Sequence, residues 1–235
     1  MQHNALDPIG VEVTDLNLTD VSVSALRELR HLLAEHGVVV LPNQRIDDPA
    51  FIAFLRLFGH LTFSEGETPV AGFPDLNVIS NVGRSTPPRS VFHVDTSYVR
   101  QPPAYTALRA VDIPVEGGET LFTNQYQAYQ TLPREIREEL AGRTIRHVMT
   151  GRTALYLSTP DRCVAISGMD DEQGREMIDF LYRHSTAEDN TYRHSWSAND
   201  VVMWDNGCVM HRADHAGVVG DRVMHRGMVS DYAYG

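Results

Sequence analysis

Residues 201–212 read VVMWDNGCVMHR, and in them turn residues separate two short β-rich runs. Similar runs recur along the chain beyond residue 75. We expect strands over residues 76–80, 105–111, 119–122, 144–148, 163–166, 201–204, 209–212 and 223–229. Many short strands broken by turn residues are typical of a β-sandwich, a jelly roll or a barrel. The pattern therefore predicts a mainly β protein without choosing among the three.

Helices are expected before these strands and in two inserts between them. Leu26, Leu29 and Leu33 lie on one stripe at helical spacing, and Gly37 provides a stop signal. Asp48 is the expected N-cap of a second helix with proline at its first position. The four predicted helices cover residues 23–36, 48–58, 133–141 and 171–184, and two further strands cover 11–13 and 38–41. These helices would flank the β structure on its outside.

The size and composition of the chain indicate an ordinary globular protein. It has 235 residues, of which 42% are hydrophobic and 22% charged. Disordered and collagen-like proteins depart from these values. We find no low-complexity run, no glycine/serine linker and no internal repeat, so we expect a single domain over residues 1–235.

The charge balance bears on the class of partner. Acidic residues number 31 against 20 basic residues, which gives a formal net charge of -11. A protein that binds nucleic acid or an anionic membrane surface usually carries a basic patch. Apolar runs such as residues 38–41 are too short to span a bilayer. We therefore expect neither nucleic acid nor a membrane as a partner, and an anionic substrate would need local positive groups.

Two observations address the cellular compartment. Cys163 and Cys208 lack the spacing of a metal-binding pair and are expected to be free thiols in a reducing environment. The first residues show neither a basic segment nor an apolar segment of the secretory type. A cytoplasmic location is expected.

His93-Val94-Asp95 is the first candidate for chemistry. On an extended segment the side chains of residues i and i+2 point to the same face, so an imidazole and a carboxylate would converge there. His211 offers a third ligand from a distant strand. Two histidines and one carboxylate with open coordination positions suit non-heme Fe(II), and a related set suits catalytic zinc. Taken singly, each of these histidines is more typical of a structural role than of a metal ligand.

Glu116-Gly117-Gly118-Glu119-Thr120-Leu121-Phe122 is the second motif. The two glycines permit a tight turn into a strand, with the Thr120 hydroxyl near its start. By itself the motif predicts only a turn followed by a strand.

The order of these motifs resembles the taurine dioxygenase (TauD/TfdA) family of Fe(II)- and 2-oxoglutarate-dependent dioxygenases. His93-x-Asp95 is followed by Gly-Gly-Glu-Thr120, then by Trp204-Asp-Asn and His211, and finally by Arg222 and Arg226. Each motif is modest, but five in the family's order are specific. The similarity extends over nearly the whole chain and implies a double-stranded β-helix, or jelly roll, with the metal at one open end.

The resemblance also implies roles. His93, Asp95 and His211 would bind iron, and Thr120 with Arg222 would bind the far carboxylate of 2-oxoglutarate. Arg226 would face the substrate anion or lie beside the cosubstrate. With O2, the implied enzyme would oxidise, most often hydroxylate, a C–H bond of a small organic anion and release succinate and CO2. The carboxylate of Asp95 disfavours halogenation, because related halogenases lack it.

The chain departs from the family between Arg152 and Asp171, where it is shorter than most members. The substrate cover would then be more open or completed by a partner subunit, so a homo-oligomer is conceivable. The aromatic and histidine residues that bind the sulfonate in the taurine enzyme have no counterpart after residue 59 of this chain. Taurine is therefore not expected as the substrate. Candidate substrate contacts are Arg84, Arg89, Thr96 and Tyr98.

Two other functions are compatible with the same residues. A zinc hydrolase would use the three ligands on a different fold, without oxygen and without Arg222 or Thr120. A non-catalytic jelly-roll binding module would turn over no oxidisable compound.

Overall fold

The computed structural model describes the chain except residues 65, 85–89, 143–144, 147–149, 164 and 231–235. Its helices are α1 (Val23–His36), α2 (Asp48–Arg56), α3 (Gln125–Gln130), α4 (Arg134–Glu139) and α5 (Asp171–Ser185), with a 3-10 turn at Glu188–Asn190. Its strands are β1 (His3–Ala5), β2 (Val11–Val13), β3 (Val38–Leu41), β4 (Leu61–Thr62), β5 (Pro69–Val70), β6 (Phe73–Ser80), β7 (Tyr105–Asp112), β8 (Thr120–Asn124), β9 (Ile145–Arg146), β10 (Thr153–Ala154), β11 (Thr191–His194), β12 (Val201–Asp205), β13 (Val209–Ala213) and β14 (Val223–Val229).

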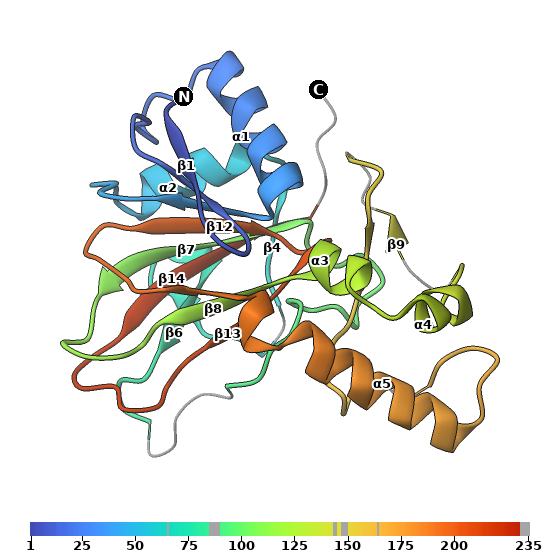
Figure 1. The fold of residues 1–235 in the computed structure, drawn as a ribbon. Coiled ribbons are helices and arrows are strands. Elements are labelled where there is room, and N and C mark those ends of the chain that lie inside the picture. The colour runs from blue at the N-terminus through green and yellow to red at the C-terminus, as the bar shows by residue number, and fades with distance from the viewer. Residues whose placement is uncertain (65, 85–89, 143–144, 147–149, 164, 231–235) are drawn as a thin grey trace.

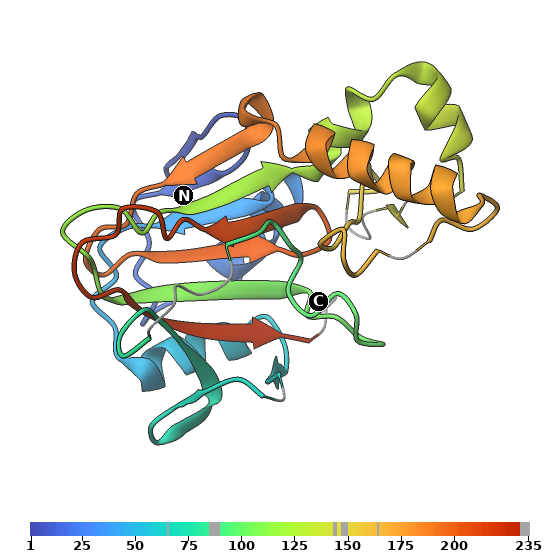
Figure 2. The same ribbon diagram turned by 90° about the horizontal axis from the view of Figure 1, so that it is seen from below.

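Most strands form two sheets that face each other. The major sheet has the order β1-β2-β3-β12-β7-β14-β6-β5, with β4 also paired to β14, and the minor sheet has the order β11-β8-β13. All of these pairs are antiparallel except β2 with β3. Helices α1 and α2 cover the outer face of the major sheet, and α3, α4 and α5 lie together at one end of the sheets (Figures 1 and 2). This is the predicted mainly β jelly roll with flanking helices.

The central strands are buried on both faces, which explains their nearly continuous apolar runs. In β12, Met203 packs in the cluster shared with α1 and α2, whereas Val202 and Trp204 pack in the cluster shared with the minor sheet. Successive side chains of a strand point to opposite faces. The interior between the two sheets therefore receives every second residue.

The same alternation sorts the polar residues of β14. Met224 faces the interior between the sheets, and Arg226 has the same parity. His225 points the other way, where its Nδ1 lies 2.7 Å from Asp48 Oδ1 at the start of α2. His225 therefore faces away from Arg226 and joins the sheet to α2.

The front of the chain matches the expected elements closely. Helix α1 covers Val23–His36, and Gly37 follows it with φ of 71°. Helix α2 begins at Asp48, but the expected N-cap is wrong by one residue, because the Asp47 side chain accepts from the Ala50 N–H. Asp48 instead pairs with Arg109 and His225.

The region before α5 differs from the expectation. The strand expected over 163–166 is wrong for the described residues there, since Cys163 N–H bonds back to Thr159 O in a turn. Of the strand expected over 144–148, the structure describes only Ile145–Arg146, as β9. Helix α3 and strand β11 carried no clear sequence signal, because both are short.

Within the described residues, no helix is long and apolar enough to cross a membrane.

Candidate metal centre and adjoining cavities

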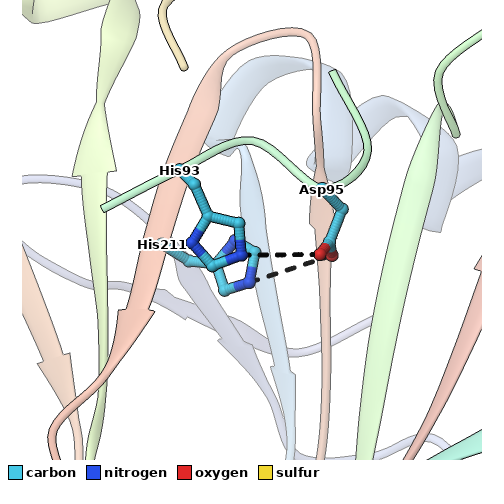
Figure 3. Close-up of side chains that lie close together, drawn as sticks. All are labelled: His93, Asp95 and His211. Atoms are coloured by element: carbon cyan, nitrogen blue, oxygen red, sulfur yellow. Dashed lines mark ion pairs between the residues drawn. The ribbon is translucent and has the colours of Figure 1, made fainter. Parts of the chain in front are cut away.

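His93, Asp95 and His211 meet between the two sheets, as Figure 3 shows. The segment that carries His93 is tied to β13 by paired backbone hydrogen bonds between His93 and His211, of 3.0 and 2.9 Å. His93 Nε2 lies 3.7 Å from Asp95 Oδ1, and His211 Nε2 lies 3.8 Å from Asp95 Oδ2. One ligand atom from each residue lies within 4.8 Å of the other two. The structure thus brings together the three predicted ligands.

The carboxylate of Asp95 is held by two donors from different strands. Thr106 Oγ1 donates to Oδ2 at 2.9 Å, and Arg226 Nη1 donates to Oδ1 at 3.0 Å. Thr106 in turn accepts from Asn206 Nδ2 at 2.9 Å. Burial alone would raise the pKa of Asp95, but the charge of the neighbouring Arg226 holds it well below its usual range. The group is therefore an ionised, acceptor-only ligand.

The histidines present unprotonated nitrogens to the same point. His93 Nδ1 lies 2.9 Å from Val91 O, so this nitrogen carries the proton and Nε2 keeps its lone pair. Burial lowers the pKa of His211 to about 3, which keeps its imidazole neutral. For His93, burial acts in the same direction, but the negative charge of Asp95 outweighs it and raises the pKa.

This donor set fits a divalent transition metal. Ligand atoms about 2.1 Å from one ion lie about 3 to 4 Å apart, which matches the observed separations. Two imidazoles and one carboxylate that leave coordination positions free are the ligands of non-heme Fe(II) oxygenases.

A cavity of about 250 Å³ opens on one side of the three ligands and contains the predicted pair Thr120 and Arg222. Arg222 is only 1% exposed. Its Nε donates to Gly118 O at 2.8 Å and its Nη2 to Thr120 Oγ1 at 3.2 Å. Its buried Nη1 has no partner among the described residues. Burial lowers the pKa of Arg222 to about 10, so the side chain is still a cation at neutral pH.

A buried cation with a spare donor calls for an anion, because an uncompensated charge is costly away from water. A carboxylate of a bound ligand would supply the missing partner. The cavity therefore fits the far carboxylate of 2-oxoglutarate.

Gly118 makes room for this arginine. Its φ is 78°, and a Cβ atom there would lie 2.9 Å from Pro114 Cγ and 3.0 Å from Arg222 Cδ. The Gly-Gly motif was expected to form only a turn before a strand. The structure assigns no turn to Gly117 and Gly118, but both have positive φ, and Gly118 lets the backbone approach the guanidinium.

Arg226 lines this cavity and a second one. Besides Asp95, it faces Glu67, whose Oε1 lies 3.0 Å from Nη2. Two carboxylates thus share its charge.

The second cavity, also about 250 Å³, lies beside His93 and Asp95 and includes the predicted substrate contacts Thr96 and Tyr98. The Arg162 guanidinium sits 4.5 Å from the centre of the Tyr98 ring. Arg84 lines the first cavity instead. Arg89, the remaining predicted contact, lies outside the described residues.

Sequence reasoning missed Thr106, Glu67 and Arg162. Thr106 lies in a predicted strand, and its parity relative to Leu108 would have placed it toward the interior. Glu67 and Arg162 lie between regular elements and offered no periodic signal.

Comparisons with known proteins agree with this geometry. The family described as taurine catabolism dioxygenase TauD, TfdA matches residues 2–150 and 144–228. The chain is 26% identical to the alpha-ketoglutarate-dependent 2,4-dichlorophenoxyacetate dioxygenase of Cupriavidus pinatubonensis, over 98% of each chain. It is 25% identical to the alpha-ketoglutarate-dependent sulfate ester dioxygenase of Pseudomonas putida, over 90% of this chain and 83% of the relative. A taurine dioxygenase structure from Burkholderia xenovorans superposes with a TM-score of 0.88 at 27% identity, over 98% of this chain and 89% of that one.

Proposed function

The chain belongs to the taurine catabolism dioxygenase TauD, TfdA family, and on that premise we propose that His93, Asp95 and His211 hold its ferrous ion. The protein is an Fe(II)- and 2-oxoglutarate-dependent dioxygenase, as its family and its relatives indicate. When bound, iron supports the O2-dependent decarboxylation of 2-oxoglutarate to succinate and CO2, coupled to oxidation of a substrate C–H bond. The convergence of the three ligands from distant parts of the chain carries the site assignment.

Asp95 is the ligand whose orientation the protein controls most strongly. Thr106 and Arg226 each hold one of its oxygens, and the Thr106 hydroxyl is itself held by Asn206. Partners that orient a metal ligand tune its affinity for the ion. We assign this orienting role to Thr106 and Arg226.

Arg222 and Thr120 bind the far carboxylate of 2-oxoglutarate in this proposal. The support is the unpartnered Nη1 of a buried arginine beside the metal ligands. The guanidinium presents a planar fork that suits a carboxylate. The same feature disfavours a zinc hydrolase and a binding module without a cosubstrate, since neither requires a carboxylate site at this position.

The substrate we propose is a small organic anion that is hydroxylated in the second cavity. Thr96, Tyr98 and Arg226 line that cavity, and Arg162 adds a second positive charge at Tyr98. The predicted contact Arg89 belongs to the same proposal. Two relatives are named for a phenoxyacetate, which is a carboxylate, and for sulfate esters.

Succinate formation tests the proposed function directly. Protein supplied with Fe(II), 2-oxoglutarate and O2 should release succinate, and more of it when a panel of small carboxylates, sulfonates and sulfate esters includes a substrate. His211→Ala should abolish this release. Full activity of His211→Ala, or zinc-restored hydrolysis without O2, would contradict the assignment.

We also propose that a second copy of the chain helps to cover the second cavity. Tyr98 at this cavity is 62% exposed, which is high for an aromatic ring beside a reaction site. Light scattering on the protein as it elutes from a gel-filtration column should give the mass of a dimer or larger assembly. A monomer would rule this out and leave the chemistry unaffected.

A further inference from the structure

The Thr120 hydroxyl receives two N–H donors. Trp196 Nε1 donates to its Oγ1 at 3.0 Å, and Arg222 Nη2 donates to the same oxygen at 3.2 Å. Thr120 is only 1% exposed, so water does not compete strongly for these bonds.

A hydroxyl group has one proton to donate and two lone pairs to accept with. Trp196 and Arg222 occupy both lone pairs, so the proton of Thr120 must point elsewhere. No acceptor for it occurs among the residues that the structure describes, and Thr120 lines the cavity beside the metal ligands. The proton is therefore available to a ligand in that cavity.

We propose that Trp196 is a positioning residue for 2-oxoglutarate, because its indole N–H fixes the Thr120 hydroxyl as a donor toward the cosubstrate carboxylate. This inference rests on the proposed function of Thr120 and Arg222. Both groups then present only donors to the ligand. A carboxylate only accepts hydrogen bonds, so it fits this arrangement. A ligand whose end group must donate a hydrogen bond does not fit.

Trp196 is itself held in place by the loop that follows β11. His194 pairs in register with Thr120, so the loop leaves the minor sheet next to the hydroxyl. The rings of His194 and Trp196 meet edge to face, with centroids 4.7 Å apart. Asp200 closes the loop, since its Oδ2 accepts from Ser197 N–H at 2.8 Å and lies 3.3 Å from His194 Nε2.

Steady-state kinetics of Trp196→Phe test the proposal in the iron-loaded enzyme. The variant keeps an aromatic ring and loses the N–H, so the hydroxyl can rotate away from the carboxylate. We expect KM for 2-oxoglutarate to rise about 5- to 10-fold, the usual effect of one lost hydrogen bond, with kcat within twofold at saturation. Tyr126→Phe is the matched control, because its hydroxyl also donates a buried hydrogen bond, to Ala34 O at 3.0 Å, and Tyr126 lines neither cavity. Its KM should not change.

A double-mutant cycle separates this role from a purely structural one. Thr120→Val should raise KM for 2-oxoglutarate by itself, and adding Trp196→Phe should then change KM by less than twofold, because the indole acts through the hydroxyl. Trp196→Leu replaces Trp196→Phe in the cycle if the latter fails to fold. An unchanged KM in the single variant, or effects that multiply in the double variant, overturns the proposal.

The two levels of failure are distinguishable. If the wild-type protein forms no succinate from 2-oxoglutarate, the proposed function fails. If the wild type is active and Trp196→Phe keeps its KM, only the role of Trp196 fails.

Discussion

Arg226 and Asp95 form a buried ion pair, in which Nη1 of the arginine lies 3.0 Å from Oδ1 of the proposed iron ligand. Arg226→Met should therefore weaken metal binding, because one oxygen of Asp95 loses its donor. Loss of a partner that orients a metal ligand typically costs about 10- to 100-fold in metal affinity. Titration of the apoprotein with Fe(II) without oxygen measures the effect.

Arg56→Met serves as the control for that titration. Arg56 pairs with Asp75 on the surface, where its side chain is 62% exposed. Its iron affinity should equal that of the wild type, and equal affinities for both variants would show that Arg226 does not support the ligand.

Glu67 forms an ion pair of 3.0 Å with Arg226, and we predict that it competes there with an anionic substrate. Glu67→Gln removes this charge, so KM for an anionic substrate should fall about threefold to tenfold while KM for 2-oxoglutarate stays constant. Glu135→Gln, on the exposed helix α4, should change neither value. A higher substrate KM in Glu67→Gln would instead indicate that Glu67 binds the substrate directly.

Gly118→Ala should displace Arg222, because the added Cβ would lie 3.0 Å from Arg222 Cδ. We expect KM for 2-oxoglutarate to rise about tenfold, together with a stability loss of about 1 to 2 kcal/mol from the positive φ. Gly142→Ala measures the stability cost of the positive φ alone, since Gly142 has the same φ of 78° and nothing within 4 Å of its Cβ position. It should lose similar stability without a change in KM. Equal KM effects at both positions would refute the proposal that Gly118 makes room for Arg222.

Asp48 joins helix α2 to the major sheet through Arg109 and His225, at 2.6 and 2.7 Å. Asp48→Asn should lower the free energy of unfolding at pH 7 by about 1 to 2 kcal/mol. Urea titrations of both proteins measure this difference.

The pH dependence of that difference has a defined sign. Burial alone would raise the pKa of Asp48, but its bonds to His225 and Arg109 lower it below the ordinary 3.8. The stabilisation is therefore complete above pH 3.8 and is lost as pH falls through the lower folded-state pKa. The two proteins should converge in stability toward acid pH. A gap that widens there would contradict the ion pair.

The elements that the sequence predicted well are those with a local signal. Helix α1 has an apolar stripe and a glycine stop, and strand β3 is a continuous apolar run, so both match their expected bounds. The strand expected at 163–166 is wrong for the described residues, because Cys163 closes a turn with Thr159 and Ala165 is exposed. Periodicity alone does not separate these cases.

The residues of the candidate site were predictable where they belong to a sequence motif. His93, Asp95 and His211 converge as expected, and Thr120 lies beside Arg222. Trp196 and Glu67 were not predictable, because their roles depend on contacts across long sequence separations. The spacing of residues along the sequence does not predict such contacts.

Strand β14 and the residue before it carry the two buried arginines of the site. Arg222 immediately precedes it and Arg226 lies within it, with an irregularity in the strand pairing at Val223 and Met224 between them, and both arginines line the first cavity. Arg226 contacts the metal ligand Asp95, and Arg222 is the proposed carboxylate anchor. We therefore expect the spacing of these two arginines to restrict the chain length of the keto diacids that the enzyme accepts.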